Sequence, residues 1–63
     1  MRTRRSHHPC DFLKACYVIW AVYVMRWTQT RAAIEIGLNG GTVNHVVHRR
    51  RFPDAYPVPL PGF

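Results

Sequence analysis

The fold is decided by the stretch from Gln29 to His48, QTRAAIEIGLNGGTVNHVVH. Gly37 divides this stretch, and glycine readily adopts the left-handed conformation in which many helices end. Thr28, which precedes the stretch, and Asn39, which follows the glycine closely, are residue types that cap helix N-termini. The sequence therefore predicts one helix on each side of Gly37, the second running from Thr42 to about Arg50.

Small and apolar residues occupy the positions at which these two helices would meet. Ala33 is small enough for two helix backbones to approach closely, and Val43 and Val46 are three residues apart on one helix face. Polar side chains then fall on the opposite face of the second helix. The residues that we expect to be buried between the helices are Ala32, Ile36, Leu38, Val43 and Val46.

This pattern resembles the helix-turn-helix motif of bacterial transcriptional regulators and of resolvase-type DNA-binding domains. The resemblance covers about a third of the chain. It implies that the second helix lies in the major groove of double-stranded DNA, where an Asn amide can pair with adenine and a Thr can contact a thymine methyl group. The candidate base-contacting residues are Asn39, Thr42, Asn44, His45 and His48, and the candidate phosphate-contacting residues are Arg49, Arg50 and Arg51.

Gly40 and Gly41 depart from the family pattern, because related proteins often place base-contacting side chains at these positions. Two glycines remove two such side chains. They also let the backbone approach phosphates closely. We therefore expect the chain to bind DNA more clearly than it distinguishes one DNA sequence from another.

The charge of the chain points to a polyanion partner. Nine Lys or Arg residues against three Asp or Glu residues give a formal net charge of +6. Two arginine clusters, residues 2–5 and 49–51, suit bidentate contact with phosphates. The alternative is a basic protein whose charge serves solubility alone. We expect residues 1–9 to form a flexible arm. Its basic residues are Arg2, Arg4 and Arg5. They either enter an adjacent minor groove or only keep the chain soluble.

A further helix is predicted from about Pro9 to Trp27, and it is apolar on all sides. One stripe, with Cys16, Ile19 and Tyr23, would face the core. The second stripe needs a cover, which is either the C-terminal tail or a second copy of the chain. We expect a homodimer, with an interface formed by Tyr17, Trp20, Val24 and Trp27.

Four prolines lie between residues 53 and 61, so the last segment cannot be helical and favours an extended tail. Side chains of this tail, such as Leu60 and Phe63, are the ones that would fold over the apolar helix. The predicted fold class is all-α: a small three-helix helix-turn-helix domain over residues 10–51. A basic N-terminal arm, residues 1–9, precedes it, and a Pro-rich C-terminal tail, residues 52–63, follows it.

Other function classes find little support in the sequence. The three acids are widely separated, so we expect no enzyme, no cofactor and no small-molecule ligand. The His7, His8, Cys10 and Cys16 spacing does not match a zinc site, and His45 with His48 supplies two ligands only, so we expect no metal. The apolar helix is too short for a membrane span, and the two cysteines favour a reducing cytoplasm.

The sequence therefore predicts double-stranded DNA binding, by a small transcriptional regulator or accessory factor. The alternative hypothesis is a protein-protein interaction module that uses the aromatic first helix and the Pro-rich tail. In that case the helix-turn-helix pattern would be scaffold alone.

Overall fold

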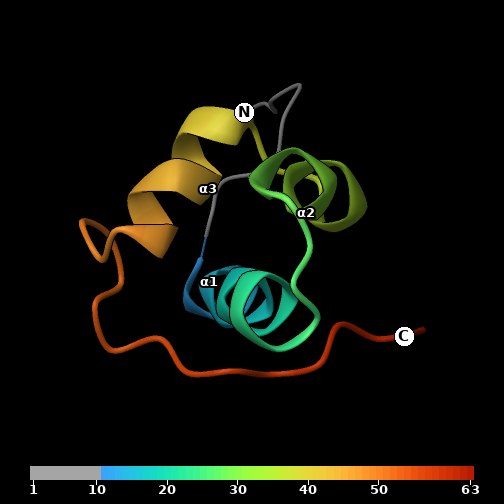
Figure 1. The fold of residues 1–63 in the computed structure, drawn as a ribbon. Coiled ribbons are helices and arrows are strands. Elements are labelled where there is room, and N and C mark those ends of the chain that lie inside the picture. Colours follow the sequence, from blue (N-terminus) through green and yellow to red (C-terminus); the bar gives the residue numbers. More distant parts are fainter. Residues whose placement is uncertain (1–10) are drawn as a thin grey trace, which may run out of the picture.

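The computed structural model describes residues 11–63, and this part of the chain is all-helical, without a strand. Its three α-helices are α1, Phe12–Ile19, α2, Gln29–Ile36, and α3, Gly40–Val47. A π-helical turn, η1, Trp20–Val24, continues α1. Helices α2 and α3 lie together on one side of α1, as Figure 1 shows. The predicted all-α class with three helices is thus confirmed for these residues.

Each α-helix begins at a side chain that satisfies a free backbone N–H. The Asp11 carboxylate accepts a hydrogen bond from the backbone N–H of Lys14 at 2.9 Å. The Thr28 hydroxyl accepts from Arg31 N–H at 3.1 Å, and the Asn39 side-chain oxygen accepts from Thr42 N–H at 2.8 Å. The two N-caps predicted from sequence, Thr28 and Asn39, are confirmed.

The turn between α2 and α3 is made at Gly37. Its φ of 87° and ψ of 37° are left-handed, a conformation that costs a residue with a Cβ about 1–2 kcal/mol. The backbone N–H groups of Gly37 and Leu38 both donate to the carbonyl of Ala33 at 2.9 Å. The predicted helix end at Gly37 is therefore confirmed.

Helix α3 differs from its predicted bounds at both ends. It begins at Gly40, so that both glycines lie in its first turn, where they cost less than in a helix interior. It ends at Val47 rather than near Arg50, because the backbone of Arg49 has a φ of 63° and leaves the helical conformation. All three clustered arginines, Arg49, Arg50 and Arg51, therefore lie beyond the helix.

The first helix also differs from its prediction, because its second half is the π-helical turn η1. Such a turn closes i→i+5 hydrogen bonds and holds more residues than an α-helical turn. The Met25 N–H donates to the Trp20 carbonyl at 3.1 Å, and the left-handed Arg26, with a φ of 62°, ends the segment. The 3.6-residue register therefore fails after Ile19. For this reason the prediction of Tyr23 as a core residue is wrong, and its side chain is 51% exposed.

The core lies where α1, α2 and α3 meet. Of the predicted residues, Ala32, Val43 and Val46 are fully buried, and Ile36 and Leu38 are partly buried against the core. Within residues 11–63 the buried residues are Ala15, Cys16, Val18, Ile19, Trp20, Ala21, Trp27, Ala32, Ala33, Val43, Val46 and Ala55.

The C-terminal segment passes along the side of α1 that faces away from α2 and α3 (Figure 1). Val58 N–H donates to the Cys16 carbonyl at 3.4 Å, and Val58 and Leu60 pack against the core. At its end, the Phe63 ring meets Trp27 edge to face with 5.0 Å between ring centroids. This segment therefore covers the apolar side of the first helix.

Two of the four residues expected at a dimer interface belong to the core of the chain itself. Trp20 is 7% exposed and Trp27 is 8% exposed, and their rings stack edge to face at 5.5 Å. Tyr17 is half-buried, and Val24 remains 54% exposed. The two largest side chains of the predicted interface are therefore already covered within one chain, and the interface itself stays a prediction.

Candidate nucleic-acid interface

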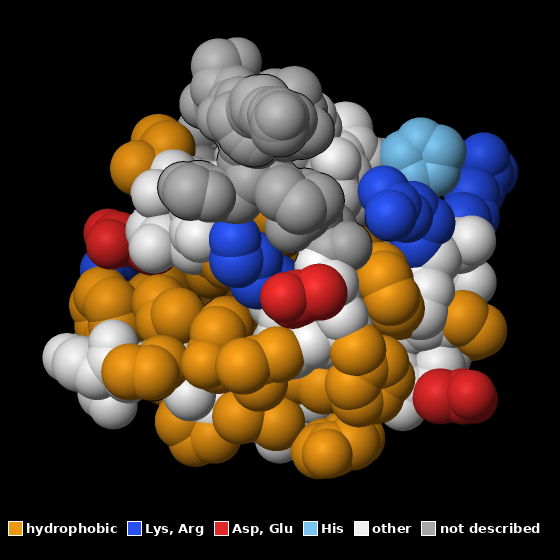
Figure 2. All heavy atoms as spheres, turned by 180° about the vertical axis from the view of Figure 1, so that it is seen from behind, with side chains coloured by type: hydrophobic (Ala, Val, Ile, Leu, Met, Phe, Trp, Pro, Cys, Tyr) orange, Lys and Arg blue, Asp and Glu red, His pale blue; other side chains and the backbone are white. Residues whose placement is uncertain are grey.

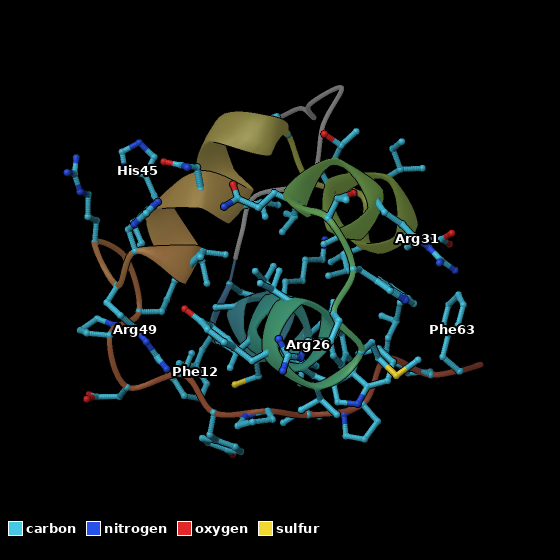
Figure 3. All side chains as sticks on the ribbon, viewed as in Figure 1. Phe12, Arg26, Arg31, His45, Arg49 and Phe63 are labelled. Carbon is cyan, nitrogen blue, oxygen red and sulfur yellow. The ribbon has the colours of Figure 1, made fainter. Side chains whose placement is uncertain are left out.

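Helix α3 separates an apolar face from a polar one. Val43 and Val46 are fully buried against the other helices. Asn44 and His45, on the opposite face, are exposed, and Figure 3 shows His45 pointing away from the rest of the molecule. Asn44 and His45, two of the residues expected to contact bases, therefore face solvent on a helix whose opposite face is buried through Val43 and Val46.

Asn44 has a partner on α2 that the sequence analysis missed. Its side-chain nitrogen, Nδ2, donates a hydrogen bond to Oε1 of Gln29 at 3.3 Å. Gln29 is the first residue of α2, so this bond joins the start of one helix to the exposed face of the next. The sequence offers a weak signal for it, an amide residue directly after the N-cap Thr28.

Asn39 and Thr42 are less available for contact with DNA than the sequence suggests. The Asn39 oxygen is the cap of α3, so this acceptor is already used, and Thr42 is half-buried. A Cβ built at Gly40 would meet no described heavy atom within 4 Å. The first turn of α3 therefore presents open backbone, while the side chains of Asn44, His45 and the exposed His48 follow it along the chain.

The three clustered arginines have three different environments. The Arg49 guanidinium donates through Nη1 to the carbonyl oxygens of Ala55 at 2.8 Å and Pro53 at 3.2 Å. The Arg51 guanidinium lies 5.4 Å from the centroid of the Phe52 ring. Arg50 is exposed. The Arg49 guanidinium therefore links the residues after α3 to the C-terminal segment, and phosphate contact by the three arginines stays a prediction.

Charge is distributed unevenly around this face. No acidic residue occurs in the sequence between Glu35 and Asp54, a range that contains all of α3 and the arginine cluster. Seen from behind, the molecule gathers Lys or Arg side chains beside a histidine on the side where α3 ends, apart from a broad hydrophobic area below (Figure 2). Helix α3 and the three clustered arginines therefore lie on a stretch of chain, residues 36–53, that carries no acidic side chain.

Arginines elsewhere in the described chain lie apart from this surface. Arg31 lies over the Trp27 ring, with its guanidinium carbon 4.4 Å from the ring centroid, and it approaches Glu35 at 3.8 Å. Arg26 follows η1 and is exposed (Figure 3). The predicted arm residues Arg2, Arg4 and Arg5 lie outside the described residues, as do His7, His8 and Cys10.

Comparison with known proteins gives no relative: no family model, no curated protein and no solved structure matches this chain. Within residues 11–63, no helix is both long and apolar enough to cross a membrane. The same residues hold no group of three or more His, Cys, Asp or Glu side chains that is placed to bind a metal ion.

Replacing Arg49 by Ala should destabilise the fold, whereas the same change at Arg50 should not. The first change removes two charge-assisted hydrogen bonds, one of them part-buried, a loss of about 1–2 kcal/mol in the free energy of unfolding. The second removes an exposed side chain, for which changes of about 0.5 kcal/mol or less are usual. Urea unfolding followed by circular dichroism measures both values. Equal stability of the two variants would show that the Arg49 contacts contribute nothing.

Proposed function

We propose that this chain binds double-stranded DNA through the exposed face of α3 and acts as a small transcriptional regulator or accessory factor. The observation that carries the proposal is the arrangement of α3. Asn44 and His45 are exposed above a valine face that is fully buried, on a stretch of chain without acidic residues. The resemblance of residues 29–48 to helix-turn-helix motifs supports the same proposal.

The dimensions of α3 suit a DNA groove. Eight residues at 1.5 Å each make a helix of roughly 12 Å, and its width with side chains, about 10–12 Å, matches that of the major groove. In this arrangement Asn44, His45 and His48 face base edges. Arg50 and Arg51, beyond the helix end, contact phosphates and fix the register without selecting a sequence.

Titration of a fluorescent duplex at several salt concentrations tests the proposal. We expect the logarithm of the association constant to fall linearly with the logarithm of salt concentration, with a slope of about −0.9 for each phosphate contact. Arg50→Ala should make that slope shallower by about 1, because it removes one such contact. Affinity that is independent of salt would contradict the proposal.

The alternative, a protein-protein interaction module, loses part of its expected surface to contacts within the chain. Trp20 and Trp27 are buried, and the Pro-rich segment lies against α1 through Val58 and Leu60. The homodimer stays a prediction. Three apolar side chains at η1 and its end are exposed and available for such a contact: Tyr23, Val24 and Met25.

A further inference from the structure

The hydrogen bond between Asn44 and Gln29 spans 15 residues of sequence and lies at an exposed position. An exposed hydrogen bond between two side chains adds little to stability, because water competes for both groups. It does restrict the orientation of the Asn44 amide, which would otherwise rotate freely. Its main consequence is therefore the direction in which Asn44 presents its polar atoms.

An Asn amide has two N–H donors and one carbonyl acceptor. Gln29 takes one of the two donors, through its own oxygen. Asn44 then keeps one N–H and Oδ1, one donor beside one acceptor. The major-groove edge of adenine presents the complementary pair, the acceptor N7 and the donor N6–H, whereas guanine presents two acceptors at N7 and O6.

In the structure Gln29 Oε1 accepts from Asn44 Nδ2, so the nitrogen end of the Asn44 amide faces the start of α2. Gln29 keeps its own Nε2 group, which is a donor, at the first position of α2. Arg31, the nearest cation on α2, is held instead by Trp27 and Glu35.

We propose that Gln29 is a positioning residue that orients Asn44 to recognise one adenine in the major groove. This inference rests on the proposed function, since it requires that α3 occupies that groove. This orientation of Asn44 gives the chain a defined preference at one base pair, although Gly40 and Gly41 in the first turn of α3 have no side chains that could contact bases.

Selection from a randomised duplex library, followed by titration of duplexes that differ at one base pair, tests this proposal. The wild type should prefer adenine at one position by about tenfold or more over each other base. Asn44→Ala should remove that preference, and Gln29→Ala should lower it at least threefold. Gln29→Glu should retain it, because a carboxylate still accepts from Asn44; its added charge weakens binding to all duplexes alike, so the ratio between bases is the relevant quantity.

The outcomes separate this inference from the proposed function. Salt-dependent binding in which Gln29→Ala leaves the adenine ratio at its wild-type value would overturn the role of Gln29 alone. An adenine ratio that survives in Asn44→Ala would overturn the role of both residues. Failure of the wild type to bind any duplex would overturn the proposed function and this inference together. Thermal unfolding of each variant serves as the control, and we expect it to match the wild type.

Discussion

Replacing Trp20 by Ala should leave most molecules unfolded at room temperature. The Trp20 side chain is 7% exposed and stacks against Trp27, itself part of the core. Truncation of a buried Trp to Ala typically costs about 3–5 kcal/mol, and a core in a domain of this size rarely supplies more than about that amount. Far-UV circular dichroism at 25 °C would show loss of helical signal in this variant.

Val24→Ala is the matched control for Trp20, since it lies on the same π-helical turn and is 54% exposed. Its free energy of unfolding should stay within about 0.5 kcal/mol of the wild-type value. A folded Trp20→Ala variant with wild-type stability would contradict the described core. It would also reopen the interpretation of Trp20 as a surface residue that contacts a second copy.

Charge reversal at Arg50 should weaken DNA binding far more than charge reversal at Arg26. Arg50→Glu and Arg26→Glu each lower the formal net charge of +6 by two, because +1 becomes −1 at one position. Arg50 follows α3, whereas Arg26 lies at the end of η1, away from His45 (Figure 3). We expect about a tenfold or greater loss of affinity from the first variant, which replaces a phosphate contact by repulsion.

The second variant should cost about twofold, since salt screens exposed charges beyond about 10 Å. Titrations of one duplex with both variants at the same salt concentration provide the measurement. Equal losses would mean that net charge alone drives binding, and a larger loss at Arg26 would place the DNA on another face.

Local signals explain the part of the fold that the sequence predicts well. Thr28, Gly37 and Asn39 act on residues within a turn of themselves, so their residue types are enough to set the ends of α2 and the start of α3. The burial of Val43 and Val46 follows from their spacing on one helix face. These predictions need no knowledge of the rest of the chain.

A change of helix register and two tertiary contacts explain the features that the sequence did not predict. The π-helical turn changes the register after Ile19, so a 3.6-residue pattern assigns Tyr23 to the wrong side. Arg49 is indistinguishable from its neighbours in sequence, and what sets it apart is the pair of carbonyls from Pro53 and Ala55. The missed site residue, Gln29, becomes visible only when the packing of α2 on α3 brings it to Asn44.

The proposed function requires that the exposed face of α3 contacts DNA. Titration of a ¹⁵N-labelled chain with duplex DNA, followed by amide chemical shifts, maps that surface residue by residue. DNA contact through this face predicts that the largest shift changes fall on residues 40–51 and on Gln29, with little change at Leu13 or Tyr56. Changes concentrated on α1 and the C-terminal segment, or no changes at all, would contradict it.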